Sequence, residues 1–251
     1  MITQRINIHI LLLAFSTTLL FSQESALDIV KKSNDLIRSK SSYAEFKMII
    51  IKPDWSREVA MKVWSIEPDY SLLLVTAPAR DKGMVTLKRK QEVWNFIPSV
   101  QKTIKIPPSM MLQSWMGSDF TNDDLVRQSS IVEDYQHQVI GEEEYEGYLC
   151  HKVELIPNPE AGVVWGKIIM WISKKGFLQL KIDYYDEDDF LVKTMKGSQI
   201  KQLGGRLIPT YWEMIPVDEP GQKTVLEYLD IEFNKKIRTN FFSQQNMKRV
   251  R

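Results

Sequence analysis

The chain has 251 residues, 43% hydrophobic and 26% charged, so it is long enough to bury one large core or two small ones. Its 33 basic and 32 acidic residues are nearly balanced. A nucleic-acid-binding protein normally carries a basic surplus, so the balance argues against that class. The only cysteine is Cys150, so no internal disulfide can form and the fold must rest on core burial.

The first 22 residues have the pattern of a secretory signal peptide. Arg5 supplies a positive charge, residues 8–21 form an apolar core, and Ser22 places a small residue at the cleavage site. A membrane anchor is the alternative, but this apolar core is shorter than the roughly 20 residues that span a bilayer. Because no cysteine stands at the cleavage site, we expect a soluble periplasmic product without a lipid anchor there, consisting of one domain over residues 23–251.

Residues 25–39 predict the first helix, which Ser25 can cap with Asp28 at the capping-box position. From residue 43 onward the chain alternates between polar and apolar positions, with turn residues every 8–12 positions, which is typical of an antiparallel meander. The strand-like segments before the centre are residues 43–52, 57–66, 70–76, 84–89, 93–97 and 100–106. Those after it are residues 132–140, 145–156, 165–173, 177–185, 191–203, 207–215 and 224–233. We expect about ten or eleven strands, in one strongly curved sheet or open barrel.

The stretch over residues 104–125 interrupts this strand pattern. On a helix, an apolar stripe would join Met111, Leu112, Trp115 and Met116, and Gly117 fits the position after the last turn. Two interpretations stay open. The stretch is either a methionine-rich lid over an apolar cavity or a crossover helix packed on the core.

The acidic end of the same stretch predicts a second short helix. Thr121 can cap it, with Asp124 three positions further on. The acidic residues 119–124 lack the glycine and distal glutamate of a calcium loop, so we interpret them as a capping and anchoring turn.

Catalytic motifs are missing from the sequence. It contains no nucleophile elbow, phosphate-binding loop, zinc-binding histidine pair or paired-cysteine motif. Cys150 and His151 are adjacent, so on a strand they point to opposite faces. We therefore expect no enzyme, no catalytic residue, no metal and no cofactor. A hydrolase that uses a pair of carboxylates stays open as an alternative, because a sequence does not give the distance between two carboxylates.

Several segments resemble the LolA-like outer membrane lipoprotein-sorting proteins, which are periplasmic lipoprotein carriers. They are Val63–Pro68, Val93–Val100 (VWNFIPSV), the central PPSMMLQSWMGSDFTNDDL and the closing segment Phe241–Val250, in the family's order. The resemblance implies a mainly β fold: an incomplete, half-open antiparallel barrel of the LolA/LolB type, with helices over its concave face. It also implies an apolar cavity that holds acyl chains.

The leading hypothesis is a periplasmic carrier or chaperone that binds acyl chains of lipoproteins or lipids and helps sort them to the outer membrane. Its partners would be that cargo, an inner-membrane transporter of the RND or ABC type and an outer-membrane acceptor, with the protein itself a monomer. The alternative is an accessory subunit of an RND-type lipid exporter. The expected cavity and lid residues are Trp64, Trp94, Phe96, Met110, Met111, Trp115 and Met116.

One position departs from the family pattern. The known carriers have a basic residue before the proline of the second-hairpin segment, where it helps to latch the lid, but here Glu67 precedes Pro68. The resemblance therefore supplies no latch for this chain.

Overall fold

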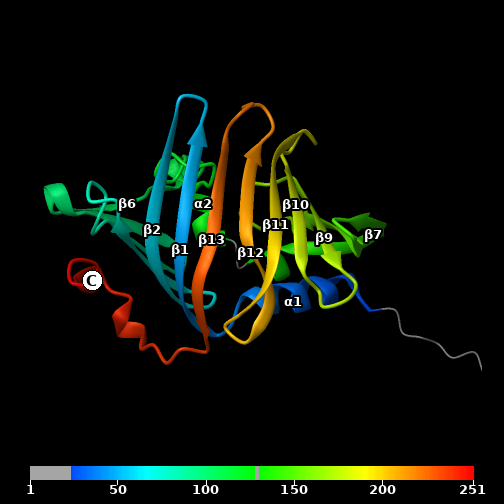
Figure 1. Ribbon diagram of the computed structural model, residues 1–251, viewed down its shortest axis with the longest axis horizontal. Coiled ribbons are helices and arrows are strands. Elements are labelled where there is room, and N and C mark those ends of the chain that lie inside the picture. The colour runs from blue at the N-terminus through cyan, green and yellow to red at the C-terminus, as the bar shows by residue number, and fades with distance from the viewer. Residues whose placement is uncertain (1–23, 128–129) are drawn as a thin grey trace, which may run out of the picture.

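One antiparallel sheet forms the frame of the molecule (Figure 1). The computed structural model describes residues 24–127 and 130–251, so the expected signal peptide lies outside the described residues. In this part of the chain the sheet has 13 strands in the order β6-β5-β4-β3-β2-β1-β13-β12-β11-β10-β9-β8-β7. The sheet curls, but its edge strands β6 and β7 do not pair with each other. The expected half-open barrel is confirmed.

Every segment with the predicted alternation contains a strand. The expected number of ten or eleven is too low, because all thirteen segments form strands, including those of the short β4, β5 and β6. The strands are β1 (Ser41–Lys52), β2 (Trp55–Ile66), β3 (Tyr70–Ala77), β4 (Val85–Arg89), β5 (Glu92–Ile97), β6 (Lys102–Lys105), β7 (Tyr135–Tyr145), β8 (Tyr148–Pro157), β9 (Lys167–Ser173), β10 (Gln179–Tyr185), β11 (Leu191–Leu203), β12 (Arg206–Pro216) and β13 (Lys223–Phe233).

The first helix lies on the concave face of the sheet. It is α1 (Ala26–Ile37), and it begins as predicted, with the Asp28 backbone N–H donating to Ser25 Oγ at 3.1 Å. Ile29 and Val30 are buried against β7, β9 and β12, so the apolar face of this helix covers the half of the sheet that contains these strands. The remaining helices are α2 (Asn122–Arg127), α3 (Gln244–Met247) and the short 3-10 turns η1 (Pro98–Val100), η2 (Pro108–Met110), η3 (Ser130–Val132) and η4 (Thr239–Phe241).

The link from β6 to β7 crosses from one sheet edge to the other. The helix that we expected over residues 110–116 does not form, and only the 3-10 turn η2 precedes a series of turns. Met116 has φ +53°, in the left-handed region, and Leu112 is 61% exposed. The apolar stripe therefore does not exist, because the backbone folds back on itself through a bridge between Ser114 and Thr121.

The half of the sheet formed by β2–β5 is covered on both of its faces. On one face, Trp115 of the central link packs with Met61, Leu73 and Val75. On the other, the C-terminal segment packs Phe242, Met247 and Val250 against Leu72, Leu87, Trp94 and Phe96. Apolar side chains are therefore buried on both faces of these strands, which matters for locating the site.

No helix in the described part of the chain has the length and apolar character needed to cross a bilayer.

Candidate ligand-binding cavity

A cavity of about 240 Å³ lies between the concave face of the sheet and the elements that cover it. Strands β1, β2 and β13 supply its floor, while Trp115, Phe120 and Ile131 belong to the link that covers it. The lining is mostly apolar. The apolar and aromatic lining residues are Ile37, Ala44, Phe46, Met48, Met61, Val63, Pro68, Tyr70, Leu73, Val93, Trp115, Phe120, Ile131, Ile182, Tyr184, Met195, Trp212, Leu226, Tyr228 and Ile231.

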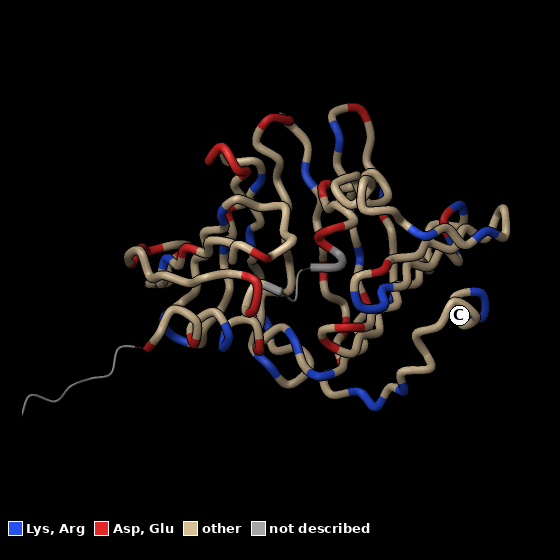
Figure 2. Tube along the Cα trace, turned by 180° about the vertical axis from the view of Figure 1, so that it is seen from behind, with Lys and Arg blue, Asp and Glu red and all other residues tan. Residues whose placement is uncertain are grey.

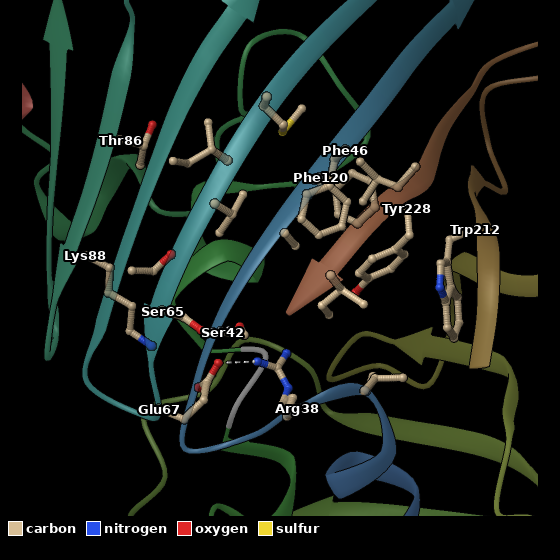
Figure 3. Close-up of a pocket in the computed structure, with 18 of the residues that line it drawn as sticks. Arg38, Ser42, Phe46, Ser65, Glu67, Thr86, Lys88, Phe120, Trp212 and Tyr228 are labelled. Atoms are coloured by element: carbon tan, nitrogen blue, oxygen red, sulfur yellow. Dashed lines mark hydrogen bonds and ion pairs between the residues drawn. The ribbon is translucent and has the colours of Figure 1, made fainter. Parts of the chain in front are cut away.

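Aromatic rings form the middle of the cavity wall. Phe46 on β1 and Tyr228 on β13 lie with ring centroids 4.4 Å apart, and Figure 3 shows Phe120 beside them. Trp115 is 4% exposed, and its indole N–H donates to Thr86 Oγ1 at 3.2 Å. This bond fixes a large apolar ring over the cavity and satisfies the ring's single polar atom.

Charged and hydroxyl side chains gather at one end of the cavity (Figure 3). Arg38 at the end of α1 pairs with Glu67 in the β2–β3 turn, Nη1 to Oε1 at 3.0 Å. Lys88 Nζ on β4 donates to the Pro68 carbonyl at 2.8 Å. The hydroxyls of Ser42 and Ser65 lie 2.8 Å apart. Glu67 thus ties the first helix to the β2–β3 turn, in the position where the resemblance would have placed a basic latch.

The link that covers the cavity holds its own shape through short-range hydrogen bonds. Thr121 and Asp124 cap α2 reciprocally: the Asp124 N–H donates to Thr121 Oγ1 at 3.1 Å, and the Thr121 N–H donates to Asp124 Oδ2 at 2.7 Å. The predicted capping box is therefore confirmed. The Asp123 N–H also donates to the Met111 carbonyl at 2.8 Å, so the turns before α2 are joined to it.

Two carboxylates of the link anchor it to the sheet. Asp124 Oδ2 lies 2.6 Å from Lys193 Nζ on β11, and both side chains are almost fully buried, at 6% and 5% exposure. Asp119 accepts hydrogen bonds at 2.7 Å from both Lys52 Nζ on β1 and Thr224 Oγ1 on β13. The acidic turn therefore fastens the cover across the middle of the sheet, as the anchoring interpretation expects.

A comparison with protein families identifies the family of this chain. The model of a protein family whose description reads "Uncharacterized protein" matches residues 67–249, well over half of the chain. The chain belongs to that family. A search of curated proteins gives no match.

Solved structures that share this architecture include proteins from three bacteria. A DUF1329 family protein from Desulfovibrio piger has a TM-score of 0.81 at 24% identity, covering 88% of this chain and 97% of its own. An outer membrane lipoprotein-sorting protein domain from Vibrio parahaemolyticus has a TM-score of 0.77 at 24% identity, with 89% and 98% covered. A LolA superfamily protein from Nitrosomonas europaea has a TM-score of 0.76 at 22% identity, with 89% and 100% covered. These likenesses establish the fold, and the LolA-like resemblance drawn from the sequence is confirmed at that level.

The cover contributes one of the seven expected ligand residues to the cavity. Trp115 lines it. Met116 lies next to Trp115 and packs against the same cluster, but its side chain is not among the lining, and its carbonyl accepts a hydrogen bond from Arg57. Met110 and Met111 pack further along the link, against Val93 and Ile106. The link therefore reaches the cavity with aromatic rings rather than with its methionines.

Three expected residues lie on the other face of the sheet. Trp94 and Phe96 are buried under the C-terminal segment, and Trp64 packs against Phe241 with ring centroids 5.4 Å apart. The sequence could not separate the two faces, because both faces of β2–β5 are apolar and covered. Phe46, Phe120 and Tyr228 were missed, and only Phe120, inside the central stretch, carried a signal that could have found it.

A second hollow, of about 620 Å³, lies along the C-terminal segment. It is larger but more open, and its lining includes Lys235, Lys236, Arg238 and Arg249. Lysines and arginines recur along this segment in Figure 2. The cavity under the cover is more enclosed and more apolar, and it is the better candidate site because most ligand pockets are concave and mostly apolar.

Cys150 and His137 do not belong to the cavity lining. Cys150 is fully buried on β8, and burial raises the pKa of its thiol to about 11. His137 on β7 makes a 2.7 Å hydrogen bond from Nε2 to the Ile131 carbonyl. Among the described residues, no three side chains of His, Cys, Asp or Glu gather in a way that could hold a metal ion.

Proposed function

We propose that this protein is a periplasmic carrier that binds an acyl chain of a lipid or lipoprotein in the cavity and helps to sort it to the outer membrane. The observation that supports the proposal most directly is the mostly apolar cavity, covered by Trp115 and Phe120, in a LolA-like fold. Each methylene moved from water into such a surface contributes about 0.8 kcal/mol. An acyl chain therefore needs no specific polar contact to bind tightly.

The size of the cavity favours a single chain. Its volume of about 240 Å³ is below the roughly 300–1,000 Å³ typical of ligand pockets. A triacylated cargo would require the cover to move away from the sheet. We propose one acyl chain for the closed form, with release following when the cover opens.

Purification from cell envelopes followed by native mass spectrometry tests the proposal. We expect a co-purifying lipid or lipopeptide, and binding of a fluorescent neutral acyl probe to the delipidated protein. Val63 lines the cavity, so Val63→Trp should fill it and abolish probe binding. Lys62→Trp adds the same ring to the neighbouring position on the opposite face of β2, so it should leave binding intact.

Two results would contradict the carrier. One is the absence of any bound lipid together with no probe binding. The other is unchanged probe binding in Val63→Trp. A stoichiometric membrane transporter captured equally well by the wild type and by Val63→Trp would instead favour the accessory-subunit alternative, in which a filled cavity is dispensable.

A further inference from the structure

The C-terminal segment, residues 234–251, concentrates positive charge. It contains six basic residues and no acidic one, whereas the rest of the chain carries 27 basic and 32 acidic residues. The six are Lys235, Lys236, Arg238, Lys248, Arg249 and Arg251. In Figure 2 the segment has blue positions and no red one. A chain whose total charge is close to neutral therefore has one strongly basic strip on its surface.

Packing on the sheet holds this segment in place. Phe242, Met247 and Val250 are buried against β3, β4 and β5. The side-chain amide of Asn246 donates to the Phe241 carbonyl at 2.8 Å, which closes the turn between them. The basic residues next to these buried side chains are exposed. The fold therefore presents the cations at fixed places on its surface.

Three of the cations have no acidic partner. Lys235 pairs with Glu232 at 2.6 Å. Lys236, Arg238 and Arg249 are exposed, and within the described part of the chain their side chains make no ion pair and no hydrogen bond. Their donors are therefore available to an anion from outside the molecule, and hydrogen bonds between charged groups are the stronger kind.

The same three cations come together around the second hollow, of about 620 Å³, with Lys235 as a fourth. The rest of its described lining consists of amide, hydroxyl, apolar and aromatic side chains, without a carboxylate. A guanidinium presents a planar fork of donors that matches a phosphate, and a lysine adds a compact charge. The hollow is therefore suited to a phosphate group.

We propose that the C-terminal segment docks the protein on a membrane of anionic phospholipids, with one phosphate headgroup in this hollow and neighbouring headgroups against Lys248 and Arg251. The two outer cations are exposed and do not line the hollow, so a single small anion inside it would not reach them. An anionic membrane surface would meet all six cations together.

A membrane fits this strip better than an acidic protein does. The core of a protein interface is normally apolar and depleted of charge. No large apolar side chain of the segment is exposed, so the strip offers charge without such a core. Each cation near an anionic lipid surface adds to the attraction, and no apolar contact is needed for that.

Docking would leave the acyl cavity free. Trp64 lines the hollow, while the adjacent Val63 lines the cavity, and neighbouring residues of a strand point to opposite faces. The docking surface therefore lies behind the sheet, away from the cover. The inference goes beyond the proposed carrier function and does not rest on it.

Flotation with lipid vesicles tests the proposal. We expect the wild type to float with vesicles that contain phosphatidylglycerol and not with vesicles of phosphatidylcholine alone. Binding should fall as salt is added, because the screening length shortens from about 10 Å at 0.1 M to about 3 Å at 1 M. Val63→Trp should bind the anionic vesicles as the wild type does, which separates docking from uptake of an acyl chain.

The triple variant Lys236→Gln, Arg238→Gln, Arg249→Gln should bind anionic vesicles roughly 100-fold more weakly, because each cation near such a surface strengthens binding about fivefold. The three side chains are exposed and have no partner among the described residues, so the Tm of this variant should match that of the wild type.

A matched control removes the same charge elsewhere. Lys175, Lys196 and Lys201 are exposed on the β9–β10 turn and on β11, in the other half of the sheet. Changing all three to glutamine should leave binding to anionic vesicles close to that of the wild type.

Three results would overturn the proposal. They are no binding to anionic vesicles, equal binding to neutral and anionic vesicles, and the same loss in both triple variants. Retention of the wild type on immobilised poly-glutamate, without any vesicle binding, would assign the strip to an acidic protein instead.

Discussion

Single polar groups that are buried away from the cavity show which chemistry the fold suppresses. Cys150 lies on β8 among Ile169, Trp171 and Leu180, where a thiolate would have no water around it. His137 is half-buried, and burial lowers its pKa against the opposing effect of its bond to the Ile131 carbonyl. Both groups are therefore kept neutral near physiological pH, which for Cys150 removes the nucleophilic thiolate form.

The Cys150 thiol should react slowly in the native protein. Its pKa is about 11, whereas a free thiol has a pKa of about 8.5, so the thiolate fraction at pH 8 falls by at least about 100-fold. We expect Ellman's reagent to modify the folded protein at least that much more slowly than protein in guanidinium chloride. Equal rates in both conditions would show that the β8 face is open.

His137 should make the protein less stable in mild acid. Its pKa is lowered in the folded state, so the unfolded chain takes up the proton first as the pH falls through about 6.5. The free energy of unfolding should therefore decrease between about pH 7 and 5. Urea titrations across that range should give a shallower decrease for His137→Gln than for the wild type, and identical slopes would exclude the effect.

The central link shows how far local sequence rules reach at the scale of an element. The capping box at Thr121 and Asp124 was predictable, because it depends on residues three positions apart. The prediction of a helix over residues 110–116 was wrong, because contacts with distant strands outweigh the helical spacing of the apolar residues there. Arg57 of β2 binds the Met116 carbonyl, and Thr224 of β13 binds Asp119, partners 59 and 105 positions away. No local pattern encodes contacts of that range.

The Asp124–Lys193 pair should dominate the attachment of the cover. Both side chains are buried, so Lys193→Met leaves a carboxylate without its partner, which typically costs roughly 3–5 kcal/mol. We expect a loss of that order in the free energy of unfolding, and faster hydrogen exchange in residues 114–127. Lys31→Met breaks the exposed Lys31–Asp35 pair instead and should change neither measurement. Equal behaviour of the two variants would argue against the anchor.

The whole molecule is one curved sheet. The central link and α1 cover its concave face, and the C-terminal segment covers the other face of β2–β5. The strands of the sheet and their antiparallel order followed from alternation and turns, which are visible in the sequence. The sequence does not show which side chains face the cavity. Trp94 and Phe46 are both apolar aromatic residues on strands, but Trp94 lies under the C-terminal segment and Phe46 lines the cavity. The ion pair between Arg38 and Glu67 joins residues 29 positions apart, so the sequence suggested only that the usual latch was missing.

A bound acyl chain should stabilise the entire fold, because the cavity connects the cover, α1 and the centre of the sheet. At a free ligand concentration of 100 times Kd the gain is about 2.7 kcal/mol. For a domain of this size that raises Tm by roughly 5–10 °C. Differential scanning calorimetry of the delipidated protein with palmitate should show this shift. Val63→Trp should show none, and a shift of the same size in that variant would place the ligand elsewhere.

The centre of the sheet brings together the first strand of the chain and the last. β1 pairs with β13 from Ser42–Phe233 to Ile51–Lys223, so contacts near the middle of the fold span about 170 to 190 positions. A ribosome makes β13 last, and until then β1 has no partner on that side and the two halves of the sheet are not joined. Pairing over such distances makes folding slow. The complete sheet should therefore form only after the whole chain has been made, because the pairing of β1 with β13 is what joins its two halves.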